Sequence, residues 1–489
     1  MRGALLLAAY ASVAVVAVVA CATTGDELLP STPDAGEPTV VSDGGTVDAV
    51  DDGASPIADA SRRDASSCSE GGWCITSLPD RDLVLKDIWP LESRAFAIAE
   101  SHTLGIKVLE WDQTTGTWGY IDDNNQNEYG FGQFAGKIWA PNENEVYYAS
   151  APSFIYHGVR SAPSSPWSWQ RERLEDHSHD PVPEHDHGLG YYYDGNSGES
   201  AIVPALGVWG TSADDVYAWY ANTIFHRKSE DGGAPTWIAE YILEDADSVA
   251  DTTYIFSASG SGRDDVWFAS GRVRYDPSGT NPINRRDYAC PVVIHKTAEG
   301  YRRLVDTVID DSNSYFDACR QKPGTVRLED TQPIGSTNIT SAWEHVGWLT
   351  SAESAGQNAI VGILEGNSLA YVTSDDGGLA RRNEIQKLTV PSNEFGALLL
   401  SSVWVHEAHA WASGWGLILQ IDNNPGAWST GRGLRTPDDN AVDSGTYRIS
   451  SSVLNGVPLD APLYQVRGTS NTNLWAIGAR YALHKTTTP

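Results

Sequence analysis

The sequence VWGTSADDVYAW at residues 208–219, followed by IFHR at residues 224–227, decides the fold. Short runs in which apolar residues alternate with small or polar ones are typical of β-strands, and Asp, Asn and Gly between such runs favour tight turns. The stretch therefore predicts consecutive antiparallel strands joined by short turns.

The same pattern recurs along the chain, which indicates a repeat architecture. Each copy has a first strand, a second strand rich in aromatic residues or alanine, and an apolar third strand. The copies begin at Ile88-Trp89, Ile138-Trp139, Val208-Trp209, Ser259-Gly260, Ala342-Trp343, Val403-Trp404 and Arg467-Gly468, and the one at Ala342 is the weakest.

Four short strands per unit, at a period of tens of residues, predict a β-propeller. Residues 73–489 divided among seven units give about 60 residues per unit, against roughly 40–50 for a bare blade, so the surplus lies in insertions. We expect an all-β, seven-bladed propeller of four-stranded antiparallel blades over residues 73–489. Two β-sandwich domains would explain the strands but not the repeat. A turn from third to fourth strand recurs at Asp112 to Trp118, Asp231 to Trp237 and Asp422 to Trp428.

The last copy ends too early to complete its own blade. Its third strand covers residues 482–485, close to the end of the chain, whereas Trp73-Cys74-Ile75-Thr76 precedes the first copy without a blade to join. An open ring would leave exposed sheet edges, which proteins avoid. We therefore predict that an N-terminal strand, within residues 73–85, completes the last blade and closes the ring.

The repeat VWG…DDVYAW…IFHR resembles the seven-bladed β-propeller repeats of secreted lipoproteins in δ-proteobacteria and myxobacteria. The resemblance covers most of residues 85–485 and implies a fold and a cell-envelope location, but little chemistry. Ser229-Glu230-Asp231-Gly232-Gly233 is also distantly similar to the Asp boxes of sialidase-like propellers. Those boxes are structural turns, so this second likeness implies no glycosidase.

The N-terminus predicts export. Residues 4–19 form an apolar run that is short for a membrane span but suits a signal peptide. The run ends in Val18-Val19-Ala20-Cys21, which resembles a bacterial lipobox. The resemblance implies that residues 1–20 are removed, that Cys21 carries the lipid, and that Ala22 directs the protein to the outer membrane, facing the periplasm or the exterior. An ordinary secretory signal cleaved after Ala20 is the alternative.

Residues 21–72 predict a lipidated cysteine followed by a disordered tether. Residues 22–72 carry eleven acidic side chains against two basic ones and almost no aromatic residues. Such a segment cannot bury enough apolar surface to offset its ordering entropy. We expect it to hold the propeller away from the membrane, which the protein contacts through the lipid alone.

Four cysteines remain once Cys21 is assigned to lipid: Cys68, Cys74, Cys290 and Cys319. Four cysteines allow three pairings, and an even number in an exported protein favours disulfides. The sequence-local pairing, Cys68 with Cys74 and Cys290 with Cys319, closes the shortest loops, and we predict it. Their spacing is unlike that of a zinc finger.

Composition excludes some functions. With 33 basic and 64 acidic side chains the formal net charge is −31, which disfavours nucleic-acid binding. The sequence contains no nucleophile elbow, P-loop, dinucleotide fingerprint or His-Glu-x-x-His motif, so we assign no catalytic residue. We expect a monomer that is more consistent with binding than with catalysis.

Long insertions suggest where binding occurs. Because strands alternate in direction, the connections from a fourth strand to the next blade and those from second to third strand emerge on one face. We place the insertions at 170–206, 305–338 and 430–463 in the first class and the one at 272–291 in the second. Loops on a rigid scaffold often carry function, so this face is the predicted binding face.

The first insertion contains the most distinctive local chemistry. His177, His179, His185 and His187 form two His-x-His pairs flanked by carboxylates, a composition that suits zinc or copper, although a solvated loop is the alternative. Residues Tyr191, Tyr192, Tyr193 and Asp194 follow and could stack on a sugar ring or a peptide side chain, or could pack the loop down. A divalent metal, Zn or Ca, is the cofactor that these hypotheses would require.

Other polar residues recur once per blade and are interpreted as structural. His157, His226, His295 and His484 share one position in the third strand. Asp214-Asp215 and Asp264-Asp265 share the turn between first and second strands, where we interpret them as turn formers that could bind Ca²⁺ weakly.

The leading hypothesis is a non-enzymatic, lipid-anchored propeller that binds a protein or a glycan through the insertion-bearing face. One alternative is a polysaccharide hydrolase or lyase with carboxylates in the central funnel. The other is a metal-binding surface protein that uses the His-rich loop.

Overall fold

The computed structural model describes residues 68–128, 134–178, 189–193, 200–229, 232–244, 251–274, 288–310, 319–326, 328–330, 347–364, 366, 368–375, 380–387, 400–422 and 447–486. The chain divides into two compact units, Met1–Arg62 and Arg63–Pro489, and every described residue lies in the second. The predicted signal peptide, Cys21 and most of the predicted tether lie outside the described residues. Within the described residues, no helix is long and apolar enough to cross a membrane.

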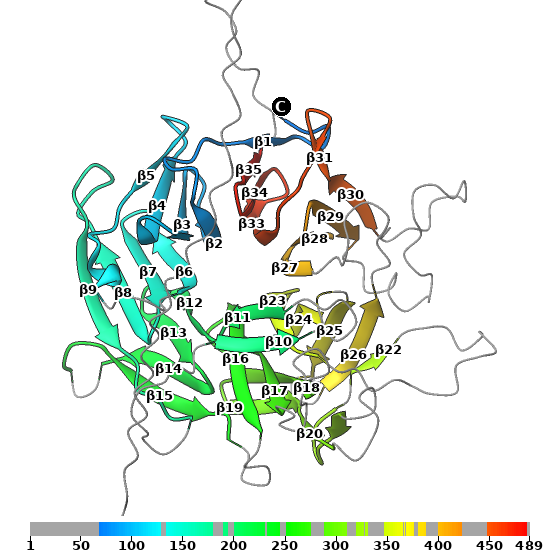
Figure 1. Cartoon of the computed structure of the whole chain (residues 1–489). Coiled ribbons are helices and arrows are strands. Elements are labelled where there is room, and N and C mark those ends of the chain that lie inside the picture. The colour runs from blue at the N-terminus through cyan, green and yellow to red at the C-terminus, as the bar shows by residue number, and fades with distance from the viewer. Residues whose placement is uncertain are drawn as a thin grey trace, which may run out of the picture. The chain divides into compact units, whose positions relative to one another are not determined.

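Seven blades of four antiparallel strands stand in a ring (Figure 1). In six of them the strands follow sequence order from the axis outward, whereas the outermost strand of the seventh is β1, the first strand of the chain. The predicted seven-bladed β-propeller is therefore confirmed. Blade 1 comprises β2 (Val84–Pro90), β3 (Arg94–Ser101), β4 (Gly105–Asp112) and β5 (Thr117–Tyr120), blade 2 β6 (Ala135–Asn142), β7 (Glu145–Ser150), β8 (Phe154–Val159) and β9 (Ser168–Arg173), and blade 3 β12 (Leu206–Ser212), β13 (Asp215–Tyr220), β14 (Thr223–Lys228) and β15 (Thr236–Ile242).

The remaining blades follow the same order. Blade 4 comprises β16 (Thr252–Gly262), β17 (Asp265–Arg274), β18 (Tyr288–Thr297) and β19 (Gly300–Val305), blade 5 β23 (Leu349–Ser354), β24 (Ala359–Leu364), β25 (Ser368–Ser374) and β26 (Ala380–Lys387), blade 6 β27 (Leu400–His406), β28 (His409–Gly414), β29 (Leu417–Asp422) and β30 (Tyr447–Ser451), and blade 7 β33 (Leu463–Ser470), β34 (Asn473–Gly478), β35 (Ala482–Lys485) and β1 (Trp73–Ile75).

Smaller elements lie in the connections between blades. They are the 3-10 turn η1 (Asn125–Asn127), the hairpins β10 (Leu189–Tyr193) with β11 (Ser200–Pro204), β20 (Thr307–Ile309) with β21 (Cys319–Gln321) and β31 (Val453–Leu454) with β32 (Val457–Pro458), and the strand β22 (Glu329–Asp330), which pairs in parallel with β26.

Burial follows position within each blade. All six residues of β13 are buried, because a second strand is covered by the neighbouring blades on both faces. The outer strand β9 has no fully buried residue, and its side chains are exposed or partly buried. This gradient explains why the second and third strands carry the most legible apolar pattern in the sequence.

β-bulges in the first strands join one blade to the next. The register shifts just before Asp87, Ser351 and Ser402, and each of these side chains accepts a backbone N–H from the next blade. Asp87 accepts the backbone N–H of Ile138 in blade 2 at 2.9 Å, and Ser402 accepts that of Val466 in blade 7 at 2.6 Å. The bulges therefore satisfy backbone donors around the axis that no strand partner could reach.

The ring closes as predicted from the sequence. β1 pairs antiparallel with β35, so that Ile75 lies opposite Leu483 and Cys74 opposite His484. The Trp73 side chain is fully buried, donates from Nε1 to Ser450 Oγ at 2.9 Å, and meets Trp411 of blade 6 edge-on. The first strand in the sequence thus completes the last blade and packs it against its neighbour.

Two strand positions differ from the sequence prediction. The first strand of blade 5 is Leu349–Ser354, not the Ala342-Trp343 pair, because Leu349 and Ser351 carry the pairing with β24. The fourth strand of blade 6 begins at Tyr447 rather than near Trp428, since Ile421 of β29 pairs with Tyr447. The Asp-to-Trp spacing therefore marks short third-to-fourth turns, as at Asp112, and fails where that turn holds an insertion.

Replacing Trp73 by Ala should destabilise the closed ring. The substitution removes a fully buried indole and its hydrogen bond to Ser450, so we expect the free energy of unfolding to fall by about 3–5 kcal/mol in urea titrations. Ile75→Ala in the same strand is the matched control, because Ile75 is 39% exposed. Equal losses in the two variants would contradict the proposed role of this contact in closure.

Candidate functional site

Two kinds of connection share one face of the ring. The turn residues between second and third strands hydrogen-bond to connections that enter a first strand: the N–H of Ala221 reaches the carbonyl of Ala205 at 2.8 Å, and that of Ala479 reaches Pro462 at 3.0 Å. This agrees with the alternation of strand direction. We call the face that carries both kinds of connection the insertion face.

Three of the four predicted insertions belong to the insertion face. Residues 174–205 separate β9 from β12, residues 275–287 separate β17 from β18, and residues 306–348 separate β19 from β23. The insertion placed at 430–463 is divided by β30, which is a correction. Residues 423–446 join the third and fourth strands of blade 6 and so leave from the opposite face, whereas residues 452–462 join blades 6 and 7 on the insertion face.

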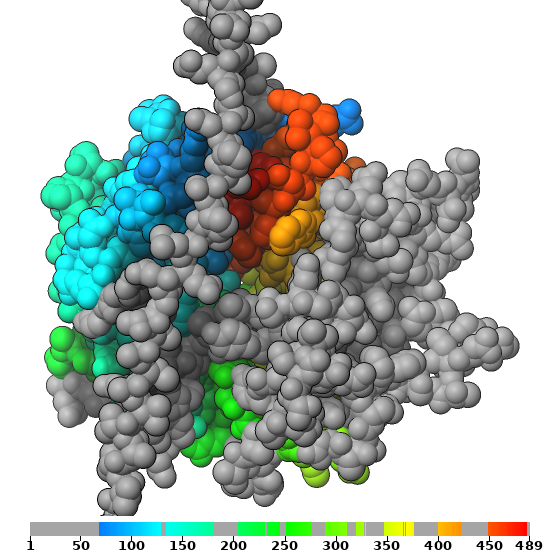
Figure 2. Space-filling view, viewed as in Figure 1, coloured from blue at the N-terminus to red at the C-terminus, as the bar shows by residue number. Residues whose placement is uncertain are grey.

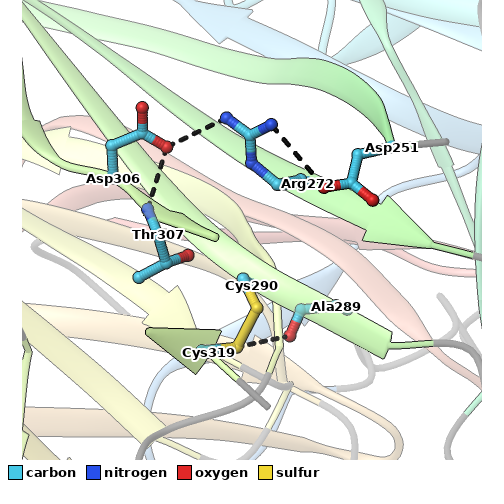
Figure 3. Close-up of a disulfide and its surroundings, with 7 residues drawn as sticks. All are labelled: Asp251, Arg272, Ala289, Cys290, Asp306, Thr307 and Cys319. Carbon is cyan, nitrogen blue, oxygen red and sulfur yellow. Dashed lines mark hydrogen bonds and ion pairs between the residues drawn. A yellow bond between two sulfur atoms is a disulfide. The ribbon is translucent and has the colours of Figure 1, made fainter. Parts of the chain in front are cut away.

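The second and third strands of blade 4 extend beyond the ring towards the insertion face. β17 and β18 pair without a break from Val266–Lys296 to Arg274–Tyr288, beyond the length of the corresponding strands in other blades. The hairpin β20–β21 packs beside this extension, and the disulfide Cys290–Cys319 joins the two (Figure 3). We call the extension together with the hairpin β20–β21 the blade-4 arm.

Both predicted disulfides are present. Cys68 bonds to Cys74 beside the closing strand, and Cys290 bonds to Cys319 within the arm. The second links two insertions that the sequence places in different connections, so the pairing fixes their relative position. The sulfurs lie among buried residues, with Ile309 completing the cluster.

A buried charge cluster supports the arm next to this disulfide. The guanidinium of Arg272 is fully buried and lies between Asp251 and Asp306, at 3.9 Å and 3.1 Å (Figure 3). Arg303 and Lys322 also contact Asp306, at 3.1 Å and 3.3 Å. Breaking one partner of a buried charge set leaves the others uncompensated, so the cluster restricts the arm to one arrangement.

The sequence reasoning missed this charge cluster. Arg272 lies in Val266–Val273, a run of β17 in which every residue is buried. A charged residue inside an otherwise apolar strand was the sequence feature that could have indicated a buried ion pair. Its partners Asp251 and Asp306 lie directly before β16 and directly after β19, so only the assembled blade brings them to Arg272.

The residues predicted for metal and ligand binding are covered in part. His177 is described, and its ring lies 6.0 Å from that of Phe225 in blade 3. His179, His185, His187 and Asp194 lie outside the described residues, and Tyr191, Tyr192 and Tyr193 are described as backbone of β10. Among the residues that the structure describes, no group of three or more His, Cys, Asp or Glu could hold a metal ion. The metal hypothesis stays a prediction.

The recurring histidines form a packing motif within blades 2, 3, 4 and 7. Each imidazole stacks on an aromatic ring of the second strand and bonds through Nε2 to the residue that begins that strand. The stacked pairs are Tyr147–His157, Tyr217–His226, Trp267–His295 and Trp475–His484, with centroids 4.1, 4.2, 3.8 and 4.0 Å apart. The Nε2 partners are Glu145, Asp215, Asp265 and Asn473, at 2.9, 3.0, 2.8 and 2.9 Å.

This motif corrects the interpretation of Asp215 and Asp265 as turn formers alone. Both side chains are buried and accept hydrogen bonds from an imidazole and from a hydroxyl of the first strand, Thr211 or Ser261. Burial raises the pKa of Asp215, but the bonds from His226 and Thr211 outweigh it, and the pKa lies below its usual value. The carboxylates are therefore internal acceptors that hold strands together.

Two of these histidines differ in acidity because their partners differ in charge. Burial lowers the pKa of His226, yet the hydrogen bonds to Asp215 and Glu240 outweigh burial and raise it overall. His484 faces the uncharged amide of Asn473, so burial acts alone and lowers its pKa to about 4. His484 is therefore neutral in the folded protein at pH 7, and its Nε2–H donates to Asn473.

Near the axis, an ion pair links blades 5 and 7. Glu353 of β23 and Arg467 of β33 lie 3.4 Å apart, and the Arg467 guanidinium also stacks 4.5 Å from the ring of Trp89 in blade 1. Burial raises the pKa of Glu353, and the positive charge of Arg467 reduces this increase. The contact between Glu353 and Arg467 therefore joins the two blades near the axis.

Comparisons with known proteins concern the architecture. No protein-family model matches the sequence, and neither does any curated protein. Similar solved structures include YCF48 from Cyanidioschyzon merolae, with 13% identity, a TM-score of 0.41 and coverage of 85% of this chain and 98% of that chain. YCF48 bound to D1 peptide and the WD40 repeats of RRP9 each show 10% identity and a TM-score of 0.45 over 86% of this chain and 98% of theirs. The fold assignment rests on the strand pairing described above.

Protonation of His484 should lower the free energy of unfolding in mild acid. Its folded pKa of about 4 lies below the unfolded value of about 6.5, so protonation favours the unfolded chain. The stabilisation is complete above pH 6.5 and is lost as the pH falls towards 4, by about 3 kcal/mol.

We expect His484→Gln to flatten the decrease in unfolding free energy between pH 6.5 and 4, measured by urea titration at each pH. His226→Gln is the control, because the raised pKa of His226 stabilises the fold below its unfolded pKa and loses that contribution as the pH rises. An unchanged pH slope in the His484 variant would contradict the assignment.

Removing the Cys290–Cys319 disulfide should increase local opening of the blade-4 arm more than opening of the ring. For Cys290→Ser with Cys319→Ser we expect a loss of about 2–4 kcal/mol, together with faster amide hydrogen exchange in β20–β21. Exchange in blades 1 and 2 should stay unchanged, which serves as the internal control. Uniform acceleration across all blades would show that the bond supports the whole ring rather than the arm.

Proposed function

We propose that the protein is an exported, lipid-anchored β-propeller of the outer membrane that binds a partner protein through the insertion face, without catalysis. The blade-4 arm is the observation that carries the proposal. A disulfide and a buried charge cluster fix two insertions to each other and to the ring. Fixing loops before binding lowers the entropy cost of association, so a braced surface is suited to recognition.

The two disulfides support the exported location, since such bonds persist in oxidising compartments. The apolar N-terminus and the Cys21 motif support the lipid anchor. Labelling cells with a radioactive fatty acid tests the anchor directly. Incorporation should require Cys21, so that Cys21→Ser abolishes it, and incorporation into the variant would contradict the proposal.

The arm also defines a sharp test of binding. Arg274 pairs directly with Tyr288, so residues 275–287 can be replaced by Asn-Gly, a two-residue turn that suits a hairpin. Lys228 pairs directly with Thr236 on the opposite face, which allows the same replacement of residues 229–235 as a matched control.

In a pull-down from envelope extract with residues 63–489, we expect a specific protein to be retained by the parent and by the 229–235 variant. The 275–287 variant should retain at least tenfold less of that protein, while its melting temperature changes little. Equal retention by both variants would contradict binding through the arm, and retention of a glycan instead of a protein would favour the alternative ligand.

A further inference from the structure

Three exposed apolar side chains lie in the connections of blade 6, away from the blade-4 arm. Among the described residues, Trp415, Val453 and Val457 are 41%, 38% and 64% exposed. All three lie on the insertion face, Trp415 in the turn between β28 and β29 and the valines in the hairpin β31–β32 that leads to blade 7. We call these three residues the blade-6 apolar surface.

Backbone contacts hold the turn and the connection from this hairpin together. Trp415 forms an antiparallel bridge with Pro462, and the N–H of Gly416 donates to the carbonyl of Ala461 at 3.2 Å. The hairpin is closed by the N–H of Leu459, which donates to Ser452 at 2.9 Å. Leu454 and Leu459 are buried in a core cluster that includes Trp404 and Trp411. The surface is thus anchored from below and presents its remaining apolar side chains to solvent.

The turn itself does not require a tryptophan. The residue that begins the corresponding turn is Ala151 in blade 2, Ala221 in blade 3 and Ala479 in blade 7. Ala151 and Ala221 are each 1% exposed, so a small side chain suffices for the turn. The Trp415 indole is 41% exposed, so it gives up part of the free energy that its burial would provide. Exposed tryptophan side chains often anchor protein interfaces, which would compensate for this loss.

A fixed polar edge lies beside this surface. Asp460, between β32 and β33, accepts a hydrogen bond from Tyr481 at 2.8 Å and forms an ion pair with Arg480 at 3.0 Å. The N–H of Ala479 donates to the carbonyl of Pro462, the same residue that Trp415 bridges, so Asp460 lies two residues from the point where the two turns meet this connection. An apolar centre with a polar rim is the usual anatomy of a protein interface. In Figure 2 the β31–β32 hairpin, in orange-red, lies uncovered on the face shown.

The charge of the protein indicates the character of the partner. The chain carries a formal net charge of −31, and a field of that sign attracts cationic segments and repels acidic ones. We propose that the blade-6 apolar surface docks a basic protein segment that presents an aliphatic or aromatic side chain. The inference rests on the proposed function in one respect only, which is that the partner is a protein.

The test uses the full chain and a panel of synthetic peptides in which a central Phe, Leu or Ser is flanked by Lys or by Glu, with affinity measured by fluorescence anisotropy. We expect Lys-flanked Phe and Leu peptides to bind at least tenfold more tightly than the Ser and Glu-flanked peptides. Trp415→Ala and Val457→Ser should each weaken that binding at least fivefold.

Two matched variants control for the loss of an exposed apolar side chain. Leu104→Ser alters a residue 38% exposed in the second-to-third turn of blade 1, and Val159→Ser alters one 40% exposed at the end of β8, on the opposite face. Both should bind as the parent does. Equal binding by Trp415→Ala and the parent, a preference for Glu-flanked peptides, or Trp415-dependent self-association would overturn the proposal.

The outcome is separable from the test of the arm. If the 275–287 variant loses the envelope partner while Trp415→Ala keeps both that partner and the peptides, the blade-6 inference fails and the proposed function stands. If the peptides require Trp415 while the 275–287 variant keeps its partner, the arm is not the binding element and the blade-6 surface is supported.

Discussion

The pairing of β1 with β35 is the constraint on which the rest of the structure depends. A propeller is a ring of sheets that contact only their neighbours, so it is stable only when the last sheet is complete and meets the first. Here the closing strand is three residues long, and its buried indole joins blades 6 and 7. The Cys68–Cys74 bond and the Lys485 contact with Gly71 reinforce the same point. Closure therefore combines backbone pairing, aromatic packing and a covalent bond.

Once the ring is closed, the blades are held by two recurring polar devices. Residues that follow a bulge in the first strands bond across to the next blade near the axis, and stacked imidazoles bond within blades 2, 3, 4 and 7 farther out. Both devices give hydrogen-bond partners to polar groups in a structure whose second strands are buried on both sides. Their repetition also explains why polar residues recur at fixed positions without being a catalytic or metal site.

The insertion face carries two regions of different physical character. The blade-4 arm contains buried charges and a disulfide, whereas the blade-6 surface is apolar, small and fixed mainly by backbone bonds. A partner that touched both would gain most of its free energy from apolar burial at the second, because the charges of the arm are buried and already paired with one another.

The amino-acid sequence determined the blade count, the closing strand and the disulfide pairing, because each is recorded in short-range patterns: a repeated apolar period, an unpaired terminal strand and cysteines that close short loops. It misplaced the first strand of blade 5 and the fourth strand of blade 6, where insertions break the period. Only the tertiary structure decided that Arg272 meets Asp251 and Asp306, that Asp215 receives His226, and that Trp415 lies beside Pro462. Such contacts join residues whose separation in sequence carries no periodic signal, and they arise because neighbouring strands and blades bring distant side chains within a few ångströms of one another.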